Sequence, residues 1–390
     1  MKRVSSYAEA VALLERAASP ADVFGEAEDG LAADAEVEAD AEAARLYRRL
    51  ARLVHPDATP DGSSRHFARL SELWHDYNAA RMPVMEVGAH RFRLGETLAS
   101  GDVAELYAAE HWTAATSANS GRAANARGRR APDGRGRGAP DGREAGAADG
   151  RGRRVVVKMP RHPADNDLMS REEEALRTLR RDGDRKFRAY APELVTAFRH
   201  RDPGTGETRR VNVLAPLDGF VTFAEIGAAH PDGLDPRDAA WMWRRLLVAL
   251  GFAHQAGVVH GAVLPEHVLV HPGEHGLVLA DWCYSVTRPG GRVPAMVGRH
   301  ADLYAPEIPA REPAVPATDV FMASRCVARL MGRRAPAAMR RFVAGCVLPA
   351  PHRRPRDAWR LLAELDELLD RLYGPRTFRP FTMPSGGSHG

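Results

Sequence analysis

The chain has 390 residues, of which 44% are hydrophobic and 27% are charged, and its formal net charge at pH 7 is +4. A chain longer than roughly 300 residues usually divides into more than one domain, so we expect at least two. No apolar run approaches the ~20 residues of a membrane span, and Glu9 and Glu15 do not suit a signal peptide. These features predict a cytoplasmic protein without a membrane partner.

The cysteines and lysines are few. Cys283, Cys326 and Cys346 are odd in number and form no Cys-x-x-Cys motif, which excludes a disulfide framework and a zinc site and predicts buried thiols. Only three of the 55 basic residues are Lys, a preference for Arg typical of a GC-rich bacterial coding sequence. A lysine within an apolar strand is therefore a candidate functional residue, and Lys158 is in that position.

The first predicted elements are three amphipathic helices within residues 1–82. Their apolar stripes recur at helical spacing and begin at Tyr7, Leu46 and Phe67. The intervening stretch from Asp22 to Glu42 holds nine acidic residues and no basic one. It offers little to bury, so we expect part of it to be mobile.

From Arg91 the pattern changes to strands, and a second domain is expected over 83–375. Its predicted small lobe covers 91–216, its large lobe 217–375, and a flexible tail follows at 376–390. The predicted helices lie near 171–180, 236–255, 319–331, 337–346 and 356–372, with strands near 155–157, 194, 211–214, 268 and 277–280. Strands followed mainly by helices predict an α+β fold with a small all-α domain before a two-lobed one.

A low-complexity segment of Gly, Arg, Ala, Asp and Pro interrupts the predicted strands at 113–153. It cannot bury enough apolar surface to offset its ordering entropy, so we expect a disordered insertion that splits a strand pair. Between Gly121 and Arg154, ten Arg and four acidic residues give a local charge of +6. The segment has no aromatic residue to stack on bases, so we favour a solvated spacer over salt-dependent binding to nucleic acid.

The tripeptide His55-Pro56-Asp57 follows a predicted helix and precedes a polar loop and a second amphipathic helix. Pro56 cannot continue a helix and Asp57 suits a loop, so a simple helix-ending turn is one interpretation. The preceding helix also carries a basic face, formed by Arg45, Arg48, Arg49 and Arg52.

With residues 21–25, 47–51 and 67–77, this pattern resembles the J-domain, the DnaJ-type co-chaperone module, over residues 19–81. The resemblance implies that the basic helix and the loop bind a DnaK-type chaperone and stimulate its ATP hydrolysis. The chain departs from the family in its longer, acidic link before the second helix. No Gly/Phe-rich or cysteine-rich client-binding region follows.

A second set of motifs resembles the eukaryotic-like Ser/Thr protein kinases over residues 91–372. The landmarks occur in the family's order: Lys158 on a strand, Glu172 on the following helix, the loop 258–270, Asp281, Glu307 within 304–307, Asp319 and Arg354. The resemblance implies a nucleotide site at Gly101, Lys158 and Glu172, with ATP and Mg²⁺ as ligands. Asp281 and His267 are the implied metal ligands. His260, Asp319, Glu307 and Arg354 are the implied scaffold residues: we expect the first two to connect the catalytic loop to the helix near 319 and the last two to form a buried ion pair.

The chain departs from the kinase pattern at the residues that would act in catalysis and metal binding. Ala262 replaces the aspartate that accepts the substrate hydroxyl proton, and a methyl group cannot act as a base. Leu264 replaces the loop lysine, and His267 replaces the asparagine that binds the second magnesium. Of the glycine-rich loop only Gly101 remains. We therefore expect a pseudokinase.

The retained residues also have simpler interpretations. Lys158 can be a surface lysine at a strand end, and Asp281 can cap a turn.

We expect a co-chaperone or scaffold that engages a DnaK-type chaperone and an unknown client, with ATP as a conformational ligand. The alternatives are an active atypical Ser/Thr kinase, because phosphoryl transfer depends mainly on positioning and charge, and a scaffold that binds neither nucleotide nor chaperone.

Overall fold

The computed structural model describes residues 4, 6–25, 33–56, 64–81, 84–113, 152–201 and 206–384. It is 49% helical and 19% strand, which agrees with the predicted α+β class. The chain divides into two compact units, residues 1–95 with 110–151 and residues 96–109 with 152–390. The expected domain boundaries at 82, 216 and 375 stay predictions.

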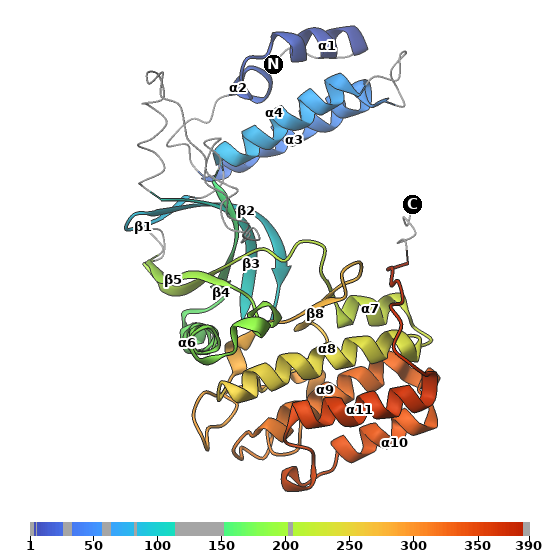
Figure 1. Ribbon diagram of the computed structural model, residues 1–390. Coiled ribbons are helices and arrows are strands. Elements are labelled where there is room, and N and C mark those ends of the chain that lie inside the picture. The colour runs from blue at the N-terminus through green and yellow to red at the C-terminus, as the bar shows by residue number, and fades with distance from the viewer. Residues whose placement is uncertain are drawn as a thin grey trace, which may run out of the picture. The chain divides into compact units, whose positions relative to one another are not determined.

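The helices of the first unit are α1 (Tyr7–Arg16), α2 (Ala21–Phe24), α3 (Ala33–Val54) and α4 (Arg65–Arg81). Helix α1 begins with a capping box, in which the Ser6 hydroxyl accepts the Glu9 amide and Glu9 accepts the Ser6 amide. Helices α3 and α4 run side by side (Figure 1). Their facing side chains join α1 and α2 in a separate small core that includes Leu14, Leu50 and Leu70.

The acidic stretch is more regular than the sequence led us to expect. Helix α3 begins at Ala33, so residues 33–42 are helical. Alanine and glutamate are both strong helix formers, so these residues form a helix although they have no apolar stripe. Residues 26–32 of the stretch lie outside the described residues, as do Asp57 and residues 114–151 of the expected insertion.

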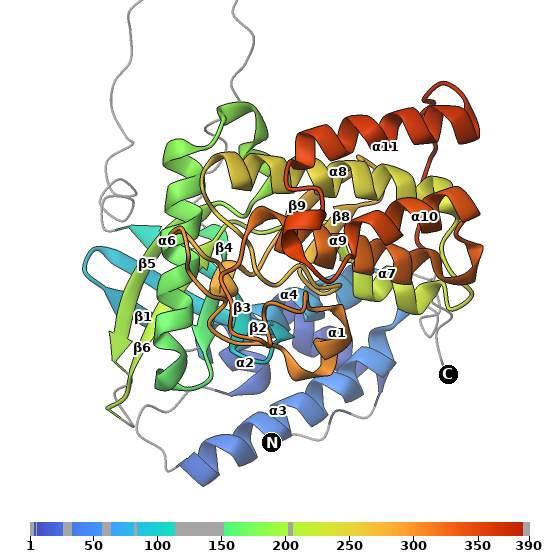
Figure 2. The same ribbon diagram turned by 90° about the horizontal axis from the view of Figure 1, so that it is seen from below.

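A six-stranded sheet has the order β1-β2-β3-β4-β6-β5. The strands are β1 (Val84–Val87), β2 (His90–Ser100), β3 (Ala104–Thr113), β4 (Arg153–Pro160), β5 (Leu194–Arg201) and β6 (Thr208–Leu214). Strands β3 and β4 are neighbours, so the chain from 114 to 152 joins two paired strands as predicted. Helix α6 (Asn166–Asp182) packs on β4, β5 and β6 (Figure 2).

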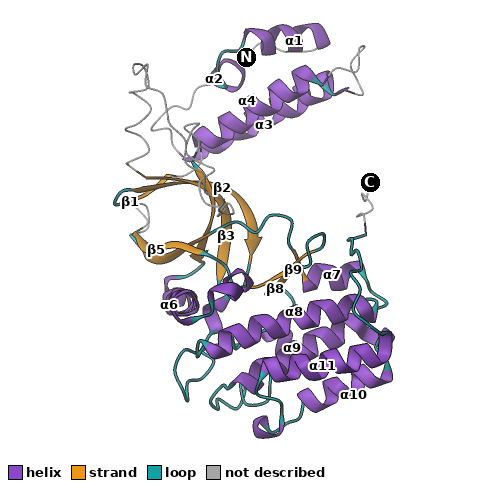
Figure 3. Ribbon diagram, viewed as in Figure 1, coloured by secondary structure: helices purple, strands orange, loops and turns teal. Residues whose placement is uncertain are grey.

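The remainder of the second unit is mainly helical (Figure 3). Its long elements are α7 (Phe223–Ala229), α8 (Pro236–Gln255), α9 (Pro316–Met331), α10 (Ala337–Cys346) and α11 (Ala358–Tyr373). A second sheet contains β7 (Val221–Thr222), β8 (Val268–His271) and β9 (Gly276–Leu279). Short 3₁₀ turns are η2 (Pro163–Asp165), η3 (Arg185–Tyr190), η4 (Trp282–Tyr284), η5 (Gly298–Leu303), η6 (Gly332–Arg334) and η7 (Pro351–Arg353).

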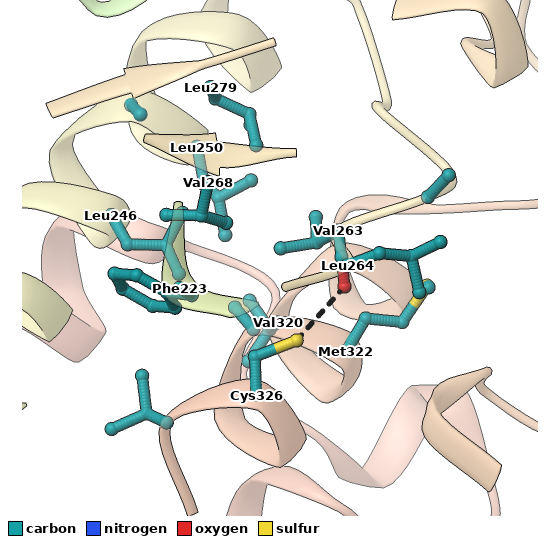
Figure 4. Packing of buried hydrophobic residues seen from close by; sticks show 14 of the residues in the cluster. Phe223, Leu246, Leu250, Val263, Leu264, Val268, Leu279, Val320, Met322 and Cys326 are labelled. Carbon is teal, nitrogen blue, oxygen red and sulfur yellow. Dashed lines mark hydrogen bonds between the residues drawn. The ribbon is translucent and has the colours of Figure 1, made fainter. Parts of the chain in front are cut away.

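The large core lies around α8, which packs against α9, α11 and strand β9 of the second sheet. Phe223, Leu246 and Leu250 are at most 1% exposed there, and they pack beside Val268 (Figure 4). The Cys326 thiol donates to the carbonyl oxygen of Val263 at 3.2 Å within this core. All three cysteines are buried and free, as predicted.

Residues 376–384, which we expected to belong to a flexible tail, follow α11 and return to α8. Arg379 forms ion pairs with Asp235 at 3.1 Å and Asp238 at 3.0 Å, and Phe381 is 5% exposed within the large core.

Among the described residues, no helix has the length and apolarity that would span a bilayer.

Candidate functional site

A buried lysine is the centre of the candidate site. Lys158 lies near the end of β4 and is 4% exposed. Its ammonium group donates to Glu172 Oε1 at 2.8 Å, to Asp281 Oδ1 at 2.9 Å and to Cys283 Sγ at 3.3 Å. An ammonium has three N–H donors, so this geometry gives each of them an acceptor.

The sheet and α6 together position Glu172. Its second oxygen, Oε2, accepts from Asn212 Nδ2 at 2.9 Å, and Asn212 lies opposite Lys158 in the β4–β6 register. Asn212 also donates to the carbonyl oxygen of Met169 on α6 at 3.0 Å. The fully buried Asn212 therefore connects the sheet to the helix that carries the glutamate. Sequence reasoning did not identify this residue, because only the strand register places it there.

Asp281 follows β9 and has a left-handed backbone, with φ of 59°. Its Oδ1 accepts from Lys158, and its Oδ2 lies 3.1 Å from His267 Nε2. The other ring nitrogen of His267, Nδ1, lies 2.8 Å from the carbonyl oxygen of Ala262. Both nitrogens of His267 thus face acceptors, an arrangement that suits the imidazolium form with two N–H donors.

The pKa shifts agree with this assignment. Burial alone would lower the pKa of His267, but the charge and hydrogen bond of Asp281 raise it above its usual value of 6.5. Burial alone would raise the pKa of Asp281, yet Lys158 and His267 hold it well below its usual value of 3.8. Burial also opposes the charge on Lys158, but Asp281, Cys283 and Glu172 raise its pKa well above 10.5. The site therefore contains two cations and two carboxylates, and its charges balance internally.

Glu172, Asp281 and Cys283 also form a group whose ligand atoms all lie within 4.8 Å of one another. The Lys158 ammonium contacts all three, so it already supplies the cation that such a group attracts. Mg²⁺ prefers six oxygen ligands. Here both oxygens of Asp281 are engaged by N–H donors, and His267 offers nitrogen. The donor set in this arrangement does not fit Mg²⁺.

The loop that carries Ala262 is organised by the buried Asp319 at the start of α9. One carboxylate oxygen accepts the His260 amide and the other accepts the Gly261 amide, both at 2.8 Å, so the expected link between this loop and the helix is present. Gly261 has φ of 76°, and a Cβ there would lie 2.8 Å from the Tyr284 carbonyl oxygen. Ala262 itself is fully buried and offers no acceptor side chain.

His260 is fully buried in the neutral form. Its Nδ1 accepts the Ala262 amide at 3.2 Å, so Nε2 carries the proton and donates to the Ala280 carbonyl oxygen at 2.9 Å. Burial lowers the pKa of His260 to about 4, and the nearby Asp319 carboxylate only partly opposes this effect.

The expected ion pair between Glu307 and Arg354 is present and buried. Arg354 donates to both carboxylate oxygens, at 2.7 Å and 2.9 Å, and the Thr318 hydroxyl donates to Glu307 at 2.8 Å. A bidentate pair with further hydrogen bonds is the geometry in which a buried ion pair is satisfied.

Gly101 lies in the turn between β2 and β3, where its amide donates to the Ala104 carbonyl oxygen at 2.9 Å. Within the described ranges it forms no hydrogen bond with Lys158, Glu172 or Asp281. The next residue, Asp102, instead pairs with Arg299, whose Nε also lies 3.6 Å from Glu266 Oε1. The structure therefore groups Lys158, Glu172, Asp281 and His267 and leaves Gly101 outside this group.

In the first unit, four arginines on α3 form a continuous exposed face, and none pairs with a side chain in the described parts of the chain. They recur at the spacing of one helix face and are Arg45, Arg48, Arg49 and Arg52. His55, directly after α3, is also exposed, and its ring meets the edge of Phe67 at a centroid distance of 5.3 Å. Pro56 follows it, and Asp57 lies outside the described residues.

Comparison with protein-family models and with curated proteins found no match to this chain.

The neutral form of His260 predicts a specific pH dependence of stability. The unfolded chain binds a proton at this residue near pH 6.5, whereas the folded chain binds it only near pH 4, so acid favours unfolding. His260 alone should lower the free energy of unfolding by about 2 kcal/mol between pH 7 and pH 5.

Urea denaturation of the wild type and of His260→Gln at several pH values would measure this effect. We expect the stability advantage of the wild type over the variant to shrink as the pH falls. All other titrating groups are common to both proteins, so an advantage that does not change with pH contradicts the neutral assignment.

Proposed function

We propose that this chain is a J-domain fused to a protein-kinase-like domain that has lost normal phosphoryl transfer. It acts as a regulatory co-chaperone or scaffold that engages a DnaK-type chaperone and binds a protein client. The observation that carries the proposal is the face of four exposed arginines on α3, which pair with no side chain among the described residues and lie directly before the exposed His55.

The charge arrangement of α3 supports binding to an acidic protein surface. Exposed arginines that pair with no side chain among the described residues have donors for a partner, and opposite charges accelerate encounter and determine orientation. Helices α3 and α4 pack on their own core, so this face is presented by a stable helix pair. Both features are what the J-domain resemblance requires.

The arrangement of the Lys158 group supports the loss of phosphoryl transfer. Ala262 leaves no base where the resemblance requires one, and His267 engages the carboxylate oxygen that a metal would need. ATP could gain an N–H of Lys158 only if Glu172, Asp281 or Cys283 gave one up. We therefore assign ATP the role of a conformational ligand, since binding would have to rearrange contacts that join β4 to the residues after β9.

The co-chaperone proposal predicts that the full chain raises the steady-state ATP turnover of a purified DnaK-type chaperone. His55→Gln should remove this stimulation, because the His55 side chain is exposed for contact with the chaperone. His352→Gln replaces another exposed histidine, outside α3 and the loop after it, and should leave the stimulation unchanged. A wild-type protein that does not stimulate turnover contradicts the proposal.

The second candidate function, slow phosphoryl transfer by an atypical Ser/Thr kinase, makes the opposite prediction for labelled ATP. On our proposal, phosphate incorporation into the chain or a model substrate is the same for wild type and Asp281→Ala. Incorporation that Asp281→Ala abolishes, but that Asp302→Ala at an exposed carboxylate retains, would favour the kinase and contradict our proposal. Incorporation that survives Asp281→Ala comes from a contaminant.

A further inference from the structure

A pocket separate from the Lys158 group lies on the second unit. The pocket, of about 680 Å³, is bounded by the first half of α8, by the end of α11 and by residues 374–380, which follow α11. This volume lies in the range of pockets that bind small organic molecules. No residue of this pocket belongs to the site described above.

The segment 374–380 forms one wall because its far end is attached to the large core. Arg379 pairs with Asp235 and with Asp238, at the beginning of α8. Phe381 is buried, and its ring lies 6.1 Å from that of Trp241. The charge of Arg379 is thereby compensated, so this residue shapes the pocket and is not the group that would bind a ligand.

Stacked rings form a second feature of the pocket. Trp241 and His275 are nearly parallel, with centroids 4.0 Å apart and an interplanar angle of 6°. Phe378 follows at 4.5 Å from His275 with its ring tilted by 30°, and 70% of Phe378 is exposed. An exposed aromatic ring at the end of a buried stack is a platform for a further flat ring.

The third feature is an excess of positive charge, since four arginines line the pocket beside one carboxylate, that of Asp370. Arg376 lines the pocket, and its side chain has no ion pair or hydrogen bond with another described residue. Arg244 pairs with Asp366 at 2.6 Å, and Arg237 lies over the Tyr373 ring at 5.1 Å. Partial burial, followed by the charges of Arg244 and Arg245, lowers the pKa of Arg376, and Asp366 and Tyr190 oppose this shift. Two like charges therefore act on Arg376. An anion would relieve that repulsion.

We propose that this pocket binds a small organic anion that carries an aromatic ring, the chemical class to which mononucleotides belong. The ring stacks on Phe378, and the anionic group accepts from Arg376 and Arg237. Guanidinium groups match phosphate and carboxylate oxygens with two parallel N–H donors, so the arginines provide orientation as well as charge. The inference rests on this pocket alone and does not depend on the proposed co-chaperone function.

A small molecule is favoured over a peptide by how the pocket is enclosed. Helices α8 and α11 and the attached segment 374–380 form walls around a single concavity, whereas an extended peptide usually needs a groove or a sheet edge. An acidic peptide remains the competing occupant, and the experiment distinguishes the two.

The test uses the full chain and AMP as the probe, with binding measured by isothermal titration calorimetry in the absence of divalent metal. Inorganic phosphate supplies the charge without the ring, and adenosine supplies the ring without the charge. We expect AMP to bind more tightly than either fragment. Arg376→Gln and Phe378→Ala should each weaken AMP binding roughly tenfold, because each removes one of the two contacts.

Arg371→Gln is the matched control, since Arg371 is an exposed arginine near the same end of α11 that does not line the pocket. Its affinity for AMP should equal that of the wild type. Melting temperatures would verify that each variant is folded, which is expected because Arg376 and Phe378 are both exposed.

Two outcomes overturn the proposal. Absence of AMP binding, or binding that neither Arg376→Gln nor Phe378→Ala weakens, excludes this pocket as a site for the probe. AMP that binds at the Lys158 group would bind equally well to wild type, Arg376→Gln and Phe378→Ala. Failure of this proposal is therefore distinguishable from failure of the proposed function, which is tested by chaperone ATP turnover. A glutamate-rich hexapeptide with one tryptophan that binds where AMP does not, and loses affinity in the same variants, would replace the small anion with a peptide.

Discussion

The buried ammonium group of Lys158 is the constraint on which the second unit depends. A charge can be removed from water only where other charges and hydrogen bonds satisfy it, and Lys158 satisfies this condition with three acceptors from two parts of the chain. Glu172 brings α6 against the sheet, and Asp281 and Cys283 bring the residues after β9 to the same point. Loss of either carboxylate would leave an uncompensated buried charge, which usually costs about 3–5 kcal/mol.

Two further buried carboxylates position the loops around the Lys158 group. The loop that holds Ala262 is positioned by Asp319, and the segment near Glu307 is positioned by Arg354. Neither of these contacts uses Ala262 or His267. The scaffold contacts therefore do not depend on which side chains stand at positions 262 and 267. His267 instead contributes a partner for the Asp281 carboxylate, since its Nε2 lies 3.1 Å from Asp281 Oδ2.

Local patterns in the sequence were sufficient to predict most of the helices and strands. Helices α8 and α10 begin and end where predicted, because each segment contains an apolar stripe that follows a proline, and the Asp235 side chain also caps α8. The resemblance to protein kinases implied the pairing of Lys158 with Glu172, and the structure contains this ion pair. The roles of Asn212 and Cys283 were not predictable, because they depend on strand register and on residues more than 100 positions apart. The burial of Phe381 likewise depends on a distant surface of α8, which periodicity in the tail does not reveal.

The central claim is that Lys158 and His267 supply the positive charge that a divalent metal would bring to Asp281. Electron paramagnetic resonance with Mn²⁺, which shares the preference of Mg²⁺ for oxygen ligands, tests it most directly. We expect wild type and Asp281→Asn to bind the same number of Mn²⁺ ions at millimolar metal. His267→Asn, which introduces an oxygen ligand and frees one oxygen of Asp281, should bind one ion more. One ion fewer in Asp281→Asn than in the wild type would show that Asp281 binds metal, and this inference would then be wrong.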